Sequence, residues 1–212
     1  MNSDEARARM QEIQRIMERA TLWTLLPSTA AIVGGLLVLA GCAASYAMFR
    51  SLDFADMLGL PVSGQAAFCV MWFAIAVAGV LLEGVLTARA ARRQGIAPTA
   101  RSARLALLSL TPSVVVAMVL TVKFLIPVAP RPEEIRYIVP VWMMLYGTGV
   151  YTAGLFSIRP PRGLGLTFLA LGMAALLVFP QYGVVSAAVS FGLLHIVFGC
   201  YVLGKQRQRG EP

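Results

Sequence analysis

The chain has 212 residues, of which 58% are hydrophobic and only 13% charged, with a mean hydropathy of +0.74. A soluble domain carries about 25% charged residues, so this chain has too little polar surface to cover a globule in water. Its net charge is +8, but the basic residues lie in the gaps between apolar stretches. We therefore expect lipid headgroups, and not nucleic acid, as the partner of these charges. The composition predicts an integral membrane protein.

Residues 1–20 are predicted to form an amphipathic cytoplasmic helix that precedes the membrane. Apolar residues recur there at steps of three and four, as at Met10, Ile13 and Met17. Glu5 and Arg9 have the spacing of an ion pair along a helix. Four arginines balance four acids in this segment, so it is not expected to be a basic lipid anchor. It either docks on the bundle or on a second copy, or is a solvated lead-in helix.

Six apolar stretches follow, and most reach the roughly 20 residues that a membrane-spanning helix needs. The predicted spans are Leu22–Phe49, Ala66–Leu86, Leu105–Ile126, Tyr137–Ile158, Gly163–Phe179 and Val184–Leu203. We therefore expect an all-α bundle of six transmembrane helices over residues 21–204, followed by a basic tail, 205–212. A short interfacial helix that ends before Pro61 is expected between the first two spans. The third span contains Pro112, which should bend it.

The connections between spans predict the orientation of the chain. Thr87–Arg104 is expected to be a basic loop, 127–136 a Pro-rich loop of mixed charge, and Arg159–Arg162 a tight basic turn. Fourteen of the eighteen Lys and Arg fall on one side of the predicted membrane, three fall on the other, and Lys123 lies inside a span. Short basic loops stay in the cytoplasm, so both termini of this multi-pass protein are expected there.

Cys42, Cys69 and Cys200 lie in apolar stretches, without a CxxC pair. No disulfide framework, metal site or cofactor is expected from this pattern. The sequence Leu39-Ala40-Gly41-Cys42 also matches a bacterial lipoprotein cleavage site. The leader before it is unusually long and its charged part contains four acids, unlike a secretory leader, so the first span is expected to be retained.

Two further segments, MERATLWTLLPSTAAIVGG and FGLLHIVFGCYVLGK, resemble stretches of uncharacterised bacterial inner-membrane proteins of similar length. The resemblance covers about a fifth of the chain. It implies a location in the bacterial inner, or cytoplasmic, membrane, and it implies no activity.

The main candidate site is polar and lies in the middle of the predicted membrane. His195, the only histidine, is expected near the centre of the sixth span, with Tyr146, Tyr151, Ser190 and Ser113 near the same depth. An ionisable group at this depth is a candidate ligand or proton site. The alternatives are a neutral histidine that joins two helices by hydrogen bonds, and a haem or metal ligand, which a lone histidine supports poorly.

Glu83 is the candidate charge site. It lies toward the end of the second span that leads into the arginines, on one face with Trp72, Ala76 and Gly79. One interpretation is a carboxylate paired with arginines of the basic loop. The other is a group that handles protons or cations. Lys123 is expected near the opposite membrane surface, so we do not expect it to pair with Glu83.

Small residues on three spans predict close helix packing. They are Gly34 and Gly35 on the first span, Gly147 and Gly154 on the fourth, and Gly192 and Gly199 on the sixth. These faces favour a non-catalytic protein that works by helix–helix assembly with itself or a membrane partner. The alternative is a transporter for a small solute, an ion or a proton-coupled substrate. No nucleophile–base set or phosphate-binding motif is evident, so catalysis is not expected. A three-plus-three inverted repeat stays open as an arrangement of the six spans, but the first and fourth spans do not align convincingly.

Overall fold

We describe a computed structural model of the chain, which covers Glu5, Arg9, Met10 and residues 28–93, 101–125, 131–155 and 159–208. The described residues are helical nearly throughout and contain no strand. Six stretches are long and apolar enough to cross a membrane: Ser28–Phe49, Val62–Leu86, Leu108–Leu125, Pro132–Leu155, Pro160–Leu177 and Gly183–Gln208. The predicted six-helix membrane bundle is therefore confirmed. The Glu5–Arg9 ion pair is present at 2.9 Å, and the rest of the predicted helix over 1–20 lies outside the described residues.

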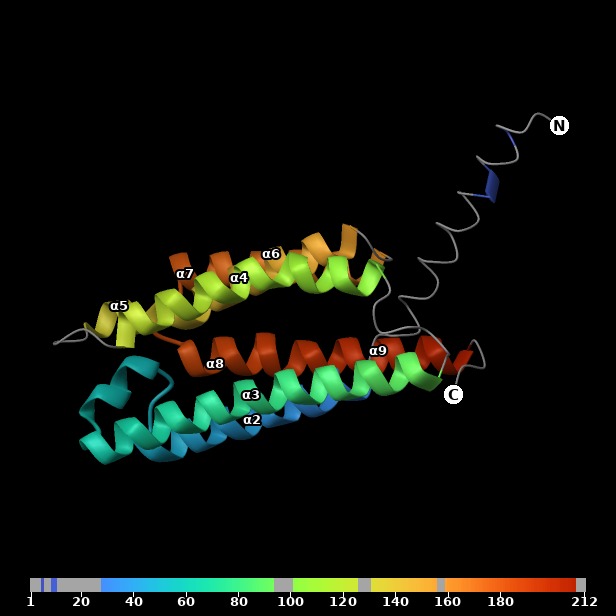
Figure 1. Cartoon of the computed structure of the whole chain (residues 1–212). Helices are drawn as coiled ribbons and strands as arrows, with labels where there is room; N and C mark the ends of the chain where they lie inside the picture. Colours follow the sequence, from blue (N-terminus) through green and yellow to red (C-terminus); the bar gives the residue numbers. More distant parts are fainter. Residues whose placement is uncertain are drawn as a thin grey trace.

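The helices of the bundle follow one another as long antiparallel rods with short elements between them (Figure 1). In order they are α2 (Ser28–Phe49), the 3-10 helix η1 (Phe54–Gly59), α3 (Val62–Arg93), α4 (Arg101–Leu125), α5 (Pro132–Arg136), α6 (Ile138–Leu155), α7 (Arg159–Leu177), α8 (Gly183–Ala187), the π-helix η2 (Ala188–Leu194) and α9 (His195–Gln208). Helix α4 continues through Pro112 without interruption.

Three predicted connections are wrong in their local structure, because helix continues into them. Helix α3 runs on to Arg93 and α4 begins at Arg101, so only residues 94–100 of the expected basic loop separate the two helices. Alanine and arginine are strong helix formers, which explains why the helix persists past the apolar stretch. The expected turn Arg159–Arg162 is the first turn of α7, where a proline needs no hydrogen bond from its nitrogen. Likewise, Pro132 begins the short helix α5 within the expected loop 127–136.

The short helix expected before Pro61 is confirmed as η1, but it does not lie flat on the surface. Phe54, Ala55 and Met57 are buried in the main apolar cluster of the bundle. Phe54 and Phe68 make an edge-to-face contact with ring centroids 5.5 Å apart, and Phe54 meets Trp72 in the same way. These aromatic contacts fix η1 between the ends of α2 and α3.

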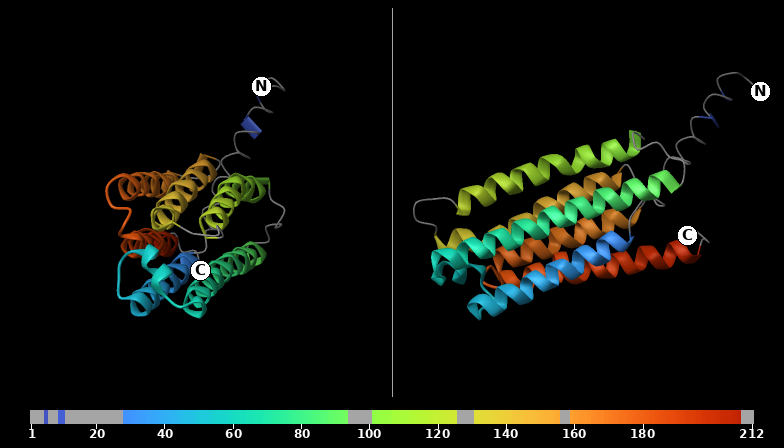
Figure 2. Two further views of the ribbon diagram at one scale, coloured as in Figure 1. Left: turned by 90° about the vertical axis from the view of Figure 1, so that its left-hand side faces the viewer. Right: turned by 60° about the horizontal axis from the view of Figure 1, so that its bottom comes forward.

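The six spans form two groups of three. The first group contains α2, α3 and the continuous segment α8–η2–α9, and the second contains α4, α6 and α7 (Figures 1 and 2). In the first group α2 packs on α3 and on α9; in the second, α6 packs on α7 and on α4. The groups lie against each other mainly through η1, α5, α8 and the neighbouring ends of α6 and α7. We call this the η1 end of the bundle.

This packing has the pattern of an inverted repeat, although the sequence did not show one. Helices α2 and α6 are the first and fourth spans, and they run in opposite directions (Figure 1). Each packs on the span that follows it and on the third span of the other half of the chain. Oppositely oriented repeats occur in many membrane carriers.

The outer surface of the bundle is apolar. Val70, Phe73 and Val80 of α3 and Val119 of α4 are all more than 60% exposed. A protein in water does not expose such continuous apolar surface, whereas a bilayer solvates it. The arginine-bearing end of α3, the start of α7 and the end of α9 meet at the end of the bundle opposite η1 (Figure 1). Of the basic residues that the sequence assigned to one side, the structure therefore gathers those of α3, α7 and α9 at one end.

Candidate functional site

The candidate polar site lies where α9 meets α6, between the two groups. The hydroxyl of Tyr146 on α6 lies 2.9 Å from Nε2 of His195, the first residue of α9. On the other side of the ring, Nδ1 of His195 lies 3.3 Å from the backbone carbonyl oxygen of Ser190. Both nitrogens of the imidazole are therefore in use. The hydrogen bond to Tyr146 ties the first group to the second.

The backbone geometry around His195 explains how the ring reaches a carbonyl of its own segment. Residues Ala188–Leu194 form a π-helix, whose wider turn displaces the usual pairing of backbone groups. The Ser190 carbonyl is five residues before His195 and accepts from its ring. The Ser190 hydroxyl is fully buried and donates to the carbonyl of Ser186 at 2.6 Å. Ser190 thus contributes its backbone carbonyl to the site, and its hydroxyl is hydrogen-bonded within its own helical segment.

The two contacts define the state of the ring. A carbonyl oxygen only accepts hydrogen bonds, so Nδ1 of His195 carries the proton. In a neutral ring Nε2 is then an acceptor, and the Tyr146 hydroxyl donates to it. A second proton on the ring would reach Nε2, and the tyrosine would have to turn its hydrogen to another acceptor. The site therefore has two hydrogen-bonding arrangements that differ by one proton.

An aromatic layer surrounds this pair. The ring of Phe168 on α7 is fully buried, with its centroid 4.8 Å from Tyr146 and 5.4 Å from His195. Phe191 of η2 stacks on the imidazole at 6.1 Å. Carbon surfaces on these sides exclude water from the hydrogen bond, which strengthens its electrostatic part.

Glu83 is the predicted charge site. Of the ten acids in the chain, it alone lies inside a predicted span. Its side chain is exposed on α3, and within the described part of the chain it forms no hydrogen bond with Tyr146 and no ion pair with Arg89 or Arg92 of the same helix. A role for Glu83 in handling protons or cations stays a prediction.

The other two predicted members of the site lie elsewhere. Tyr151 lies five positions after Tyr146, so the two side chains point in directions about 140° apart around α6. The backbone of Tyr151 lies against Gly165 of α7. The hydroxyl of Ser113 on α4 lies next to Gly149 of α6. A similar predicted depth therefore does not bring Tyr151 and Ser113 next to His195, because each contacts a different helix.

The predicted glycine faces are largely used inside the chain. A Cβ at Gly35 would lie 2.6 Å from the Gly192 carbonyl, and one at Gly199 would lie 2.7 Å from the Ser28 carbonyl, both between α2 and the η2–α9 segment. On α6, a Cβ at Gly147 would meet Gly165, and one at Gly154 would meet Arg162. Of the six predicted positions, only Gly34 has open space around it.

Three features of the structure could not be predicted from the sequence. Phe168 and Phe191 look like ordinary apolar residues, and no pattern marks a π-helix. The ion pair between Asp53 and Arg136, 2.6 Å long, joins residues 83 positions apart. Groups of His, Cys, Asp and Glu that could hold a metal are absent from the described residues. Comparisons of the chain with models of protein families, with curated proteins and with solved structures find no match.

Proposed function

We propose that this protein is a membrane carrier that moves protons, or a small cation or solute coupled to protons, along the interface between its two three-helix groups. The observation that supports this most directly is the hydrogen bond between Tyr146 and His195. It places a titratable imidazole at the junction of the groups, in the middle of two predicted spans. An ionisable group at that depth is costly and is the usual mark of a conduction path or a coupling site.

The packing of the helices supports the same proposal. Carriers with inverted repeats bind their substrates between the halves and expose the site to each side in turn by rocking one half against the other. The exchanged packing of α2 and α6 provides two such halves. In this scheme Glu83 supplies a negative charge for a cation or a proton, and His195 accepts a proton when Tyr146 reorients.

Flux through reconstituted protein tests the proposal. The protein is placed in liposomes that enclose a pH-sensitive dye, and a potassium diffusion potential drives protons inward; a parallel assay follows radioactive sodium. We expect flux above that of empty liposomes, with a loss of at least tenfold in His195→Gln and Glu83→Gln. Tyr151→Phe is the matched control, because it removes a tyrosine hydroxyl from the same helix outside the site. Proton and sodium fluxes equal to those of empty liposomes would contradict the proposal.

Assembly with a second copy or a membrane partner is the second candidate. The glycine faces that led to this hypothesis are mostly occupied within the chain, but α3 offers another small-residue surface. Gly79 and Gly84 have no heavy atom within 4 Å of an added Cβ, and neighbouring alanines are exposed. Small residues on an open helix let a second helix approach closely.

Native mass spectrometry in detergent tests this second candidate. We expect a defined oligomer or complex that Gly79→Leu disrupts. Gly192→Leu is unsuitable for the purpose, because its side chain would collide with Leu39 inside the chain. A strictly monomeric protein that retains no partner would contradict the assembly role.

We place both termini and the arginine-rich end in the cytoplasm of a bacterial cell, on the basis of the charge distribution.

A further inference from the structure

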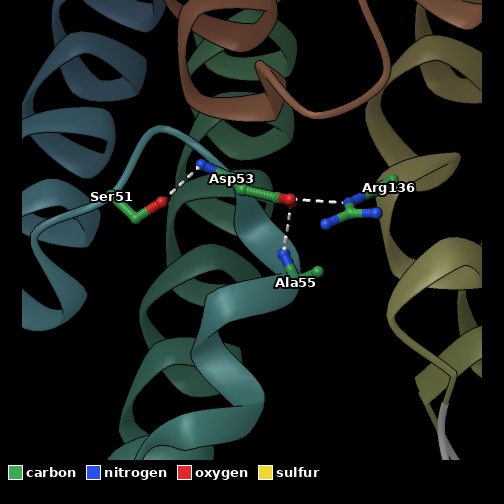
Figure 3. Close-up of polar contacts among 4 residues, drawn as sticks. All are labelled: Ser51, Asp53, Ala55 and Arg136. Atoms are coloured by element: carbon green, nitrogen blue, oxygen red, sulfur yellow. Dashed lines mark hydrogen bonds and ion pairs between the residues drawn. The ribbon is translucent and has the colours of Figure 1, made fainter.

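An ion pair joins the two groups at the η1 end, far along the bundle from His195. Arg136 is the last residue of α5, which leads into α6 of the second group. Its Nε donates to Oδ2 of Asp53 at 2.6 Å (Figure 3). Asp53 precedes η1, between α2 and α3 of the first group. The carboxylate is only 11% exposed, whereas the guanidinium side chain is 36% exposed.

The carboxylate is held in position by its own segment. Oδ1 of Asp53 accepts from the backbone nitrogen of Ala55 at 2.9 Å, which caps η1, and the backbone nitrogen of Asp53 donates to the Ser51 hydroxyl at 3.1 Å (Figure 3). One carboxylate oxygen therefore serves the cap and the other serves Arg136. Because Asp53 is fixed without the arginine, loss of the pair would leave the geometry of η1 in place.

The contacts around this pair distinguish it from the rest of the interface. The segment before η1 is tied to α8 by a backbone hydrogen bond from Val184 to the Leu52 carbonyl, 3.0 Å long. Helix α5 packs on η1, and α6 and α7 pack on α8. The Val184–Leu52 hydrogen bond lies within the first group, whereas the contacts of α5 with η1 and of α6 and α7 with α8 join the two groups at the η1 end.

We propose that the Asp53–Arg136 ion pair is a releasable clasp that closes the η1 end of the interface between the two groups. The Arg136 side chain is already 36% exposed, so water can take over the hydrogen bonds of its guanidinium when the pair opens, while Asp53 keeps the backbone hydrogen bond from Ala55. The clasp is therefore the contact most suited to open and close. The clasp goes beyond the proposed function. Only the purpose of its opening rests on that function.

A distance measurement tests the clasp without any transport assay. Spin labels are placed on Gly59→Cys and Pro132→Cys, two exposed positions on opposite sides of the pair, after Cys42, Cys69 and Cys200 are changed to alanine. An added side chain at Gly59 meets open space. In the otherwise unchanged protein we expect one narrow distance distribution. Arg136→Gln should populate a second, longer distance and speed amide hydrogen exchange in residues 50–60 and 132–138 by roughly tenfold, because a hydrogen bond to a charged, buried partner is lost.

Two further variants make the result specific. Arg131→Gln removes an exposed guanidinium just before the same short helix, and it should leave distance and exchange unchanged. Arg136→Lys keeps the charge and loses the guanidinium geometry, so an intermediate effect is expected; it also serves if Arg136→Gln does not fold. If neither Arg136 variant changes the distance or the exchange, the clasp is overturned. If the distances change but the unmodified protein carries no flux, the clasp stands and the proposed function fails.

Discussion

Helix α7 and helix α3 are the second spans of their respective halves, yet they are attached very differently. Helix α7 packs closely on α6, since a Cβ at Gly165 would lie 2.6 Å from the backbone nitrogen of Tyr151. Helix α3 contacts α2 mainly through side chains, such as Trp72 and Ile75 near Gly41. In the most apolar 18 residues of α3, within Val62–Leu86, no residue is buried. The rigid pair supplies Tyr146 and Phe168, while the loosely attached helix carries Glu83. In the proposed carrier, α6 and α7 would form the fixed side of the site and α3 the side that moves.

The largest expected effect concerns the glycine contact of the rigid pair. Gly147→Leu would place carbon within 3 Å of the Gly165 carbonyl and the Leu169 nitrogen, which are backbone atoms that cannot move aside. We expect a loss of about 3 kcal/mol or more in unfolding free energy in detergent. Gly79→Leu on α3 is the matched control, because its side chain enters open space. Equal losses in thermal unfolding of the two variants would contradict the comparison.

The next effect separates the two tyrosines of α6. Tyr146→Phe removes the donor to Nε2 of His195 and leaves a shielded ring nitrogen unpaired, so we expect a loss of about 2 kcal/mol. Tyr151→Phe should change the unfolding free energy by less than about 0.5 kcal/mol, as for most substitutions away from a buried network. Chemical denaturation in mixed micelles measures both. A Tyr151 variant as unstable as the Tyr146 variant would show that the hydrogen bond is not the cause.

A smaller effect compares the tryptophan hydrogen bonds that attach α3 to α2 and α4 to α6. The indole nitrogen of Trp72 on α3 donates to the fully buried Ser45 hydroxyl of α2 at 3.1 Å, and that of Trp142 on α6 donates to Thr121 of α4 at 2.7 Å. Each Trp→Phe change should cost about 1 kcal/mol. Hydrogen exchange should rise throughout α3 in Trp72→Phe, whereas the extensive packing of α4 on α6 should restrict the change in Trp142→Phe. Equal spread of the change in both variants would refute the idea that α3 is the loosely held helix.

The smallest expected change in stability is at Glu83. Its side chain lies on an exposed position of α3, without an ion pair in the described residues, so Glu83→Gln should alter the unfolding free energy by less than about 0.5 kcal/mol. The same variant is expected to lose flux. Measuring both quantities on one preparation separates a functional carboxylate from a structural one. A large loss of stability would mean that Glu83 holds the fold together.

The number and type of the spans could be predicted because hydrocarbon requires long uncharged helices, and the apolar stretches are long enough to show it. The exact ends of the helices could not be predicted, because charged residues do not stop a helix. Residues after Leu86 continue α3 through alanines and arginines. Glycine positions gave close packing correctly, but a glycine cannot indicate whether its neighbour belongs to the same chain.

The candidate site was predictable only in part. The depth of His195 and Tyr146 followed from their place in the spans, while the choice between Tyr146 and Tyr151 depended on which face of α6 meets α9. The pairing of Asp53 with Arg136 required the arrangement of the two groups in space, which local sequence does not contain.

The state of His195 is the most direct test of the central claim that a titratable ring is held at the junction of the groups. Since the chain has one histidine, labelling with nitrogen-15 histidine gives signals from this ring alone in solid-state NMR of the protein in lipid. We predict a neutral ring with its proton on Nδ1, and an Nε2 signal that shifts in Tyr146→Phe and not in Tyr151→Phe. A ring protonated at Nε2, with signals that are indifferent to Tyr146, would contradict it.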